Sequence, residues 1–203
     1  MSRLVKGVGI NDADYVAEVY EEVGCVGGKR KRKLIWQCPF YRTWKDMLSR
    51  GYDDEFKIRC PTYKHVTVCP EWHLFSTFRS WMVMQDWEGK QLDKDLLVTG
   101  NKVYSPENCV FVSRQVNNFM VDCGAARGLY LIGASWRKDR GKFQAHCSNP
   151  FTGKKDYLGY FTNEEQAHQA WLAKKLEHTY ALAAIQTDDR VAEALINRYE
   201  SYY

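Results

Sequence analysis

Residues 131–171 have the sequence LIGASWRKDRGKFQAHCSNPFTGKKDYLGYFTNEEQAHQAW. Three short β-prone segments, 132–138, 142–148 and 155–161, are separated by turns rich in Gly, Asp, Asn and Pro. Thr162 and Glu165 then form a capping box, which predicts a helix that runs to about residue 183. The pattern therefore indicates three strands followed by a helix, with Ala167, Ala170 and Trp171 packing on the strands.

The positive charge of the chain is concentrated in this stretch. Residues 131–161 hold six basic and two acidic residues, which equals the net charge of +4 of the whole chain. Residues 162–203 hold four basic and seven acidic residues. A basic segment beside an acidic one favours a localised surface for a polyanion, although short segments also show ordinary charge scatter of this size.

The N-terminal half shows two amphipathic patterns. Residues 12–23 are compatible with a short helix, and the basic run 29–33 after Gly27-Gly28 is interpreted as a solvated charged loop, with phosphate contact as the alternative. Two aromatic stripes at helical spacing are expected to form core: Tyr41, Trp44, Met47 and Leu48, and then Trp72, Phe75, Phe78 and Met82.

The middle of the chain leads to a linker. Ser105 and Pro106 predict the start of a short helix, 110–112 is β-prone, and Ser113 caps a helix through Met120. Residues 123–130 are expected to be a linker, and 188–203 an amphipathic helix.

The cysteines and the hydropathy exclude several classes of protein. Seven cysteines without a C-x-x-C pair argue against a disulfide framework and a standard zinc site. No apolar run is long enough for a signal peptide or a membrane span, so the sequence predicts a cytoplasmic protein without a membrane partner.

Residues 92–112 contain Leu92-Asp93-Lys94-Asp95, Gly100-Asn101-Lys102 and Tyr104-Ser105-Pro106-Glu107-Asn108-Cys109. This stretch resembles the HNH (ββα-metal) nuclease motif in its phage form, and Cys69-Pro70-Glu71-Trp72 extends the resemblance to roughly residues 38–122. The resemblance implies that Asp93, on a strand, and Asn108, on the following short helix, bind Mg²⁺ or another divalent cation such as Mn²⁺. Hard cations prefer such carboxylate and amide oxygens.

The stretch departs from the family where the general base is expected. Lys94 stands at the usual His position, and Tyr104 aligns with the usual central Asn, although Asn101 lies close by. The candidate catalytic residues are therefore Lys94, Asp95 and Asn101, with an imidazole from His65 or His73 as an alternative base. A nuclease that has lost activity but kept DNA binding is the competing interpretation.

The opening stretch resembles a second family. Gly133-Ala134-Ser135-Trp136, Lys142-Phe143-Gln144-Ala145, 157–161 and 164–167 are similar to the plant ethylene-response-factor DNA-binding domain, which also occurs in phage and homing HNH endonucleases. The resemblance implies a three-stranded antiparallel sheet that is backed by a helix and enters the major groove of duplex DNA.

Alternate residues of a strand share a face, which selects side chains for the DNA side. These are Ser135, Arg137, Lys142, Gln144, His146 and Tyr157, and the neighbouring Trp136, Lys138 and Arg140 complete the predicted DNA-binding set. Arg and Gln pair with base edges, whereas Lys mainly meets phosphate. A basic but solvated sheet face is the alternative.

The expected fold class is α+β: a ββα-metal HNH core followed by a three-stranded antiparallel sheet packed on one helix. The expected domains are an N-terminal region (1–122, motif 92–112), the linker 123–130, a DNA-binding domain (131–183) and a C-terminal helix (184–203). The expected function is a metal-dependent homing-like endonuclease of phage type that cleaves or nicks duplex DNA in the bacterial cytoplasm. The alternatives are an inactive HNH-derived DNA-binding regulator, an RNA-binding protein and a protein-binding adaptor.

Overall fold

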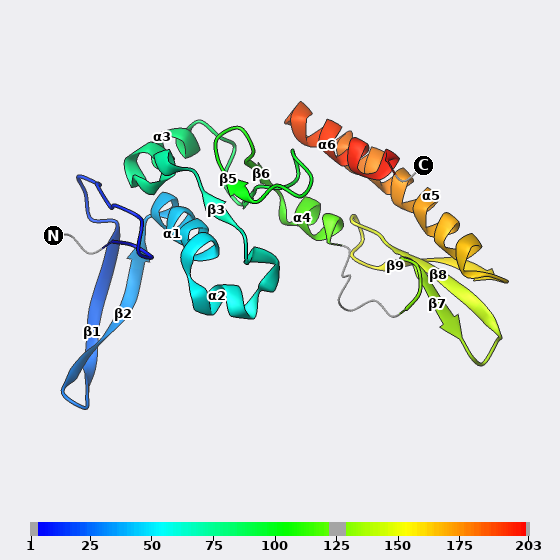
Figure 1. The fold of residues 1–203 in the computed structure, drawn as a ribbon, viewed down its shortest axis with the longest axis horizontal. Helices are drawn as coiled ribbons and strands as arrows, with labels where there is room; N and C mark the ends of the chain where they lie inside the picture. Colours follow the sequence, from blue (N-terminus) through cyan, green and yellow to red (C-terminus); the bar gives the residue numbers. More distant parts are fainter. Residues whose placement is uncertain (1–3, 122–128, 202–203) are drawn as a thin grey trace. The chain divides into compact units, whose positions relative to one another are not determined.

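The computed structural model describes residues 4–121 and 129–201 (Figure 1). The chain forms two compact units: unit 1 comprises residues 1–88 and 100–111, and unit 2 comprises residues 89–99 and 112–203. Helices and small sheets make up both units, so the mixed α+β class is confirmed. Within the described ranges, no helix has the length and apolar character that a membrane crossing requires.

Unit 1 begins with a long antiparallel hairpin, which we call the ribbon. Strands β1 (Glu18–Val26) and β2 (Lys29–Gln37) are joined by Gly27 and Gly28, whose φ angles are 58° and 75°. Two consecutive positive φ angles are the geometry of a type I′ hairpin turn, which Gly-Gly adopts without strain.

The predictions for this part of the chain were therefore wrong. The residues expected to form a helix over 12–23 include the first half of β1, and the expected loop over 29–33 lies in β2. The charged run tolerates a strand because both faces of the ribbon are in water, so no hydrophobic alternation is needed.

The remainder of unit 1 is built around two helices. Helix α1 (Pro39–Tyr52) buries the first predicted aromatic stripe, and α3 (Phe75–Val83) buries Phe75, Phe78 and Met82 of the second. Trp72, the remaining residue of the second stripe, is buried just before α3, where its carbonyl accepts a hydrogen bond from the Nε1 of Trp44 at 2.7 Å. Between them lie α2 (Asp54–Arg59), the short 3-10 helices η1 (Pro61–Tyr63) and η2 (Pro70–His73), and β3 (Thr67–Val68). Strand β5 (Val103–Tyr104) pairs with β3 in parallel.

One helix start in this region was predicted incorrectly. Residues 106–108 form a turn in which the amide of Cys109 donates to the carbonyl of Ser105 at 3.1 Å. Ser105 and Pro106 therefore begin a single turn and not the predicted helix. The turn ends there because the next three residues form the fully buried strand β6 (Val110–Val112), at the boundary of the two units. Asn108 consequently lies in a turn.

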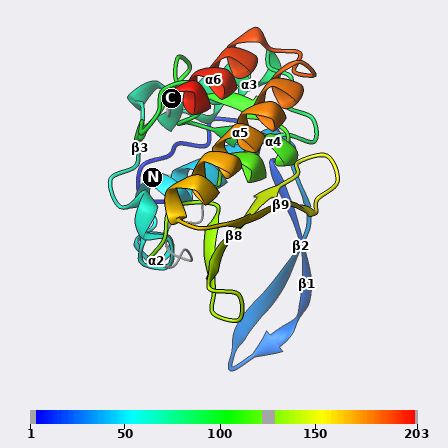
Figure 2. The same ribbon diagram turned by 90° about the vertical axis from the view of Figure 1, so that its right-hand side faces the viewer.

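Unit 2 contains the three-stranded antiparallel sheet. Strands β7 (Ala134–Arg137), β8 (Lys142–Ser148) and β9 (Lys155–Phe161) follow one another in the sheet, and helix α5 (Glu164–Ala183) packs on one face (Figure 2). Cys147, Trp171 and Leu172 form the buried core between the sheet and the helix, with Ile132 and Leu158 against it. The predicted sheet with its helix is thus confirmed.

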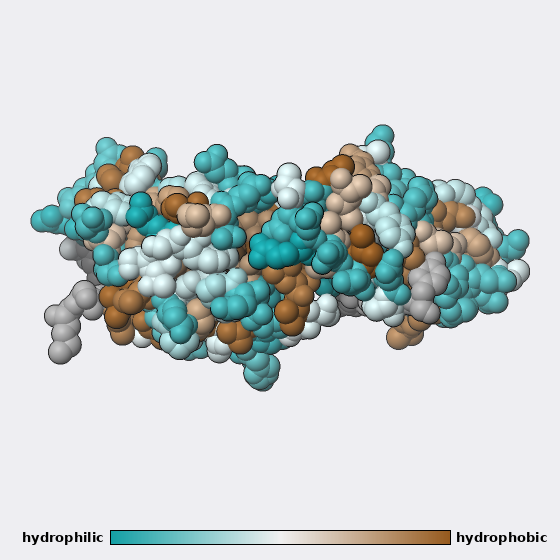
Figure 3. Space-filling view, turned by 90° about the horizontal axis from the view of Figure 1, so that it is seen from above, coloured by the Kyte–Doolittle hydropathy of each residue, from teal (hydrophilic) through white to brown (hydrophobic). Residues whose placement is uncertain are grey.

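The other elements of unit 2 are β4 (Gln91–Asp93), α4 (Arg114–Met120) and α6 (Asp189–Glu200). Ser113 caps α4 as predicted, whereas α5 is capped by Asn163, whose Oδ1 accepts a hydrogen bond from the amide of Gln166 at 2.9 Å, and not by Thr162. The predicted linker 123–130 lies largely outside the described residues. On the face shown in Figure 3, hydrophobic residues form separate small patches among hydrophilic ones.

Candidate functional site

Asp93, the first predicted metal ligand, is the last residue of β4. Its Oδ1 accepts hydrogen bonds from the amides of Asp95 (2.9 Å) and Leu96 (2.7 Å), which fixes the carboxylate at the start of a turn. Burial, and then the neighbouring Asp95 carboxylate, raise the pKa of Asp93 above its ordinary value. A bound cation would relieve this destabilisation of the charged form.

Lys94 lies next to Asp93 but is buried, with 6% of its surface exposed. Its ammonium group forms an ion pair with Oδ2 of Asp95 at 3.0 Å. Unit 2 therefore brings Asp93, Lys94 and Asp95 into one short turn. An ammonium group held against a carboxylate is suited to neutralising and positioning negative charge.

Asn101 and Asn108 meet in unit 1. Asn101 closes its own turn, since its Nδ2 donates to the carbonyl of Val103 at 2.7 Å and its Oδ1 accepts from the Val103 amide at 3.2 Å. The Nδ2 of Asn108 lies 3.5 Å from the same Oδ1. With its amide nitrogen turned toward Asn101, Asn108 keeps its carbonyl oxygen for another partner, such as a cation.

The predicted catalytic set is therefore divided between the two units. Asp93, Lys94 and Asp95 belong to unit 2, whereas Asn101 and Asn108 belong to unit 1. In the described part of the chain, no three or more His, Cys, Asp or Glu side chains are grouped to hold a metal ion. The metal-ligand roles of Asp93 and Asn108 therefore stay a prediction.

The two histidines proposed as alternative bases lie in unit 1. The Nε2 of His73 is 2.9 Å from the hydroxyl of Tyr52, which also accepts a hydrogen bond from the Val68 amide at 3.2 Å. His73 is therefore engaged in the packing of α1 against the β3 region. His65 is exposed, just before β3.

The sheet of unit 2 collects the second predicted set. The strand register pairs Ser135 with Gln144, Arg137 with Lys142, and His146 with Tyr157. Since paired residues share a face and alternate residues return to it, all six lie on the face turned away from α5. Their role in DNA binding stays a prediction.

The remaining three predicted residues lie differently. Trp136 pairs with Phe143 on the opposite face, with the two ring centroids 4.9 Å apart. Lys138 and Arg140 are exposed in the turn between β7 and β8. The guanidinium carbon of Arg140 lies 4.8 Å from the ring centroid of Tyr160, which places this charge beside the outer face.

Sequence reasoning missed Tyr160 because of an irregularity in β9. The register shifts between Ala145 and His146, so that Gln144 pairs with Tyr160 while His146 pairs with Tyr157. The bulge puts two tyrosines three positions apart on the same face, and their ring centroids are 5.8 Å apart. A strict period of two from Tyr157 would have placed Tyr160 on the other side.

The electrostatics of this outer face are positive. Burial, and then the positive charges of Lys155 and Arg137, lower the pKa of His146 below its ordinary value of 6.5. The imidazole is therefore neutral at neutral pH. Around it the face combines cationic, amide and aromatic side chains, a combination that suits phosphates and base edges.

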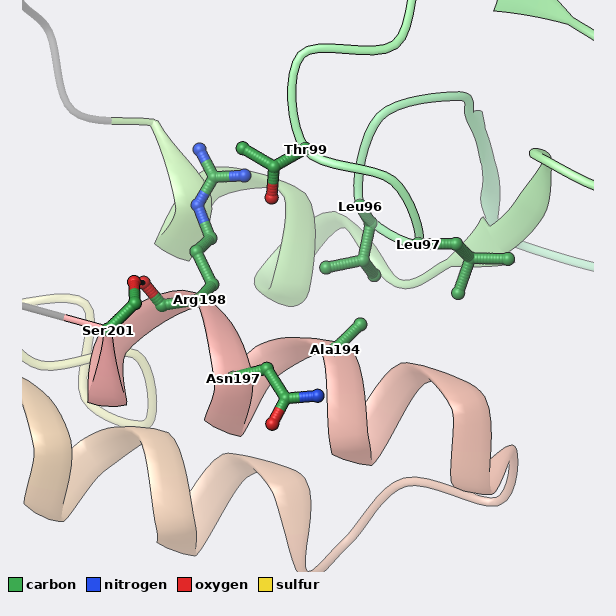
Figure 4. A pocket seen from close by; sticks show the side chains of 7 residues that line it. All are labelled: Leu96, Leu97, Thr99, Ala194, Asn197, Arg198 and Ser201. Carbon is green, nitrogen blue, oxygen red and sulfur yellow. Dashed lines mark hydrogen bonds between the residues drawn. The ribbon is translucent and has the colours of Figure 1, made fainter.

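A cavity of about 400 Å³ lies near the Asp93 turn within unit 2 (Figure 4). Its lining includes Leu96 and Thr99 from the segment after the turn and Arg198 from α6. Arg198 forms no ion pair with any residue of the described ranges and extends toward Thr99. Its contribution was not apparent from the sequence, since about a hundred residues separate it from the motif.

Comparison of the chain with protein-family models, with curated proteins and with solved structures finds no match.

Proposed function

We propose that this protein is a metal-dependent DNA endonuclease of the HNH type, directed to duplex DNA by the outer face of the β7–β9 sheet. The observation that carries the proposal is the one-sided character of that sheet. One face packs on α5, and the other presents Arg137, Lys142, Gln144 and the two tyrosines to solvent. On this proposal the protein acts in the cytoplasm, that of a bacterial host if it is phage-encoded.

The cleavage step rests on the resemblance of residues 92–112 and on the state of Asp93. Asp93 and Asn108 would hold Mg²⁺ or Mn²⁺, which, when bound, polarises the scissile phosphate and acidifies a water molecule. The half-buried Asp93 carboxylate has one oxygen fixed by the Asp95 and Leu96 amides. Lys94, held by Asp95, would stabilise the charge that develops on the phosphate, because its ammonium group is already oriented.

A plasmid assay tests the proposal directly. Supercoiled DNA should be nicked or cut with Mg²⁺ or Mn²⁺ and stay intact with chelator. Asp93→Ala and Asn108→Ala should each abolish cleavage and leave DNA binding largely intact, while Asp14→Ala, which removes an exposed carboxylate of unit 1, serves as the matched control. Full activity of either ligand variant would overturn the ligand assignment.

The role of Lys94 is tested separately. If Lys94 acts as a cation, Lys94→Arg should keep most of the activity near neutral pH. If it acts as the general base, Lys94→Arg should be inactive, because Arg is not deprotonated in proteins, and Lys94→His should restore cleavage with a rate limb near pH 6.5.

An inactive DNA-binding regulator is the second candidate function. It is favoured by one observation: Lys94, at the position of the usual general base, is buried and ion-paired. Specific duplex binding without cleavage under any metal would establish it. Stronger binding of single-stranded RNA than of duplex DNA would instead point to the RNA-binding alternative.

A further inference from the structure

Within the described part of unit 1, the ribbon is exposed along most of its length. Every residue from 19 to 36 whose side chain is described is exposed, on both faces of both strands. The ribbon extends beyond α1 and α2 in two perpendicular views (Figure 1 and Figure 2). Isolated two-stranded hairpins are only marginally stable in water, so a long one without a core points to a partner that covers it.

The apolar side chains of the ribbon support the same conclusion. Tyr20, Leu34, Ile35 and Trp36 are 42% to 53% exposed, and they lie toward the base of the hairpin. Exposed apolar groups gathered on one element are typical of interaction surfaces, because burying them against a partner is favourable.

The charge of the ribbon is unequally distributed between its strands. Five consecutive basic residues occupy positions 29–33 of β2, whereas β1 carries three glutamates. Glu18, at the base, is engaged by Lys45 at 2.7 Å, and Glu22 is shared by Arg30 (3.1 Å) and Arg32 (4.0 Å).

Lys31 and Lys33 alternate with these arginines and therefore lie on the other face of β2. In the described ranges neither lysine forms an ion pair, although Glu21 stands opposite Lys33 in the register. This face thus offers two neighbouring lysines, whose Cα atoms are about 6.6 Å apart along the strand. A polyanion is the partner whose charge complements it.

The shape of the ribbon favours duplex DNA among the possible polyanions. The major groove of duplex DNA is about 12 Å wide and admits a two-stranded β-ribbon. A second copy of the chain is a poor occupant of the β2 edge, because lysine and arginine along an edge strand oppose edge-to-edge pairing.

We propose that the ribbon is a second DNA-contacting element, in which Lys31 and Lys33 bind backbone phosphates of duplex DNA without regard to sequence. The inference rests on the proposed function only in naming DNA as the partner, and it requires no cleavage. It assigns one DNA contact to each unit, the ribbon in unit 1 and the sheet face in unit 2. Linked contacts of this kind raise the affinity of the whole chain above that of either one.

The test compares two double variants of the full-length protein in the presence of chelator. Lys31→Gln with Lys33→Gln removes two charges from the ribbon, and Arg42→Gln with Lys64→Gln removes two exposed charges from elsewhere in unit 1. Binding to a fluorescent duplex is measured as a function of salt. The slope of log affinity against log salt should fall by about 1.8 for the ribbon variant, and affinity at 0.15 M salt should fall about tenfold or more. The control should match the wild type.

Several outcomes would overturn the inference. The inference is wrong if the two double variants lose DNA affinity equally. It is also wrong if single-stranded RNA competes more tightly than duplex DNA, or if mutation of the ribbon dissociates a dimer. Melting temperatures should stay unchanged, since all four side chains are exposed. A wild type that binds DNA through the ribbon but cleaves none would contradict the proposed endonuclease and leave this inference intact.

Discussion

The ribbon and the β7–β9 sheet are both basic antiparallel structures, but only the sheet has a core. In the sheet, α5 covers one face with Trp171 and Leu172, so that the polar residues are restricted to the other. In the ribbon neither face is covered, and charged and apolar side chains are exposed on the same strands. The contrast teaches that a run of basic residues does not by itself define a binding face. Packing on one side of a sheet restricts the polar residues to the other side. Where neither side is packed, as in the ribbon, both faces can contact a partner.

The comparison predicts, first, that glycines have different importance in the two regions. A Cβ at Gly133, where φ is 85°, would overlap the Cβ and Cγ of Trp171, whereas at Gly27, where φ is 58°, it would meet no atom within 4 Å. Gly133→Ala should lower the free energy of unfolding of unit 2 by about 4 kcal/mol, from backbone strain and overpacking. Gly27→Ala should cost about 1 kcal/mol, from strain alone. Urea denaturation followed by circular dichroism measures both changes in the free energy of unfolding. Similar changes for the two variants would contradict the difference between the packed sheet and the exposed ribbon.

A lysine of α5, the helix that packs on the sheet, should also affect stability differently from a lysine of the ribbon. The Nζ of Lys175 in α5 donates to the carbonyl of Phe119 at 2.6 Å and lies 3.3 Å from the Phe119 ring centroid. Burial lowers its pKa to about 8. The folded state therefore binds this proton more weakly than the unfolded state, so this lysine makes the free energy of unfolding increase as the pH rises from 8 towards 10.5.

Lys175→Met should consequently raise the free energy of unfolding at pH 7 by about 3 kcal/mol, and by much less near pH 10. Lys31→Met, in the exposed ribbon, should change it by less than about 0.5 kcal/mol at either pH. Denaturant titrations at the two pH values provide the measurement. A destabilised Lys175→Met protein at pH 7 would show that the hydrogen bond to Phe119 outweighs the burial of the charge.

The two proposed DNA contacts should differ in sequence dependence. Arg137→Ala and Gln144→Ala should each reduce discrimination between the preferred site and a mutated one by about 2 kcal/mol, since both side chains are suited to bidentate base contacts. Lys142→Ala, like the ribbon double variant, should weaken binding to all duplexes equally. Binding measured against a randomised duplex library distinguishes these patterns. Unchanged discrimination in both Arg137→Ala and Gln144→Ala would leave the sheet without a base-reading role.

The smallest expected effect is a pH dependence confined to the sheet. Because the pKa of His146 is lowered, its imidazole is neutral at pH 7 and gains a proton only as the pH falls through that lowered value. Protonation adds a cation to the outer face, so affinity for DNA should rise by about fivefold as the pH falls through that lowered pKa. His146→Gln should lose this increase. The ribbon contains no histidine, so an equal increase in the variant would place the titrating group elsewhere.

Local sequence signals determined much of unit 2 and the helices α1 and α3 of unit 1. The alternation and turns of 131–161 predicted the strands, and the stripes at Trp44 and Phe75 predicted buried helix faces. These predictions succeeded because each element buries one face, which leaves a period in the sequence. The ribbon buries neither face, so its sequence shows no such period. The Gly27-Gly28 turn was the single feature of its sequence that indicates a hairpin.

Only the tertiary structure decided how the candidate site residues are grouped. The bulge in β9 brought Tyr160 beside Tyr157, and the fold brought Asn108 to Asn101 and Arg198 to the segment after Asp93. The division of the HNH-like stretch between two units is likewise a property of contacts distant in sequence. Residue types and spacing specify what a side chain can bind, but a register shift or a long-range contact depends on how the whole chain packs.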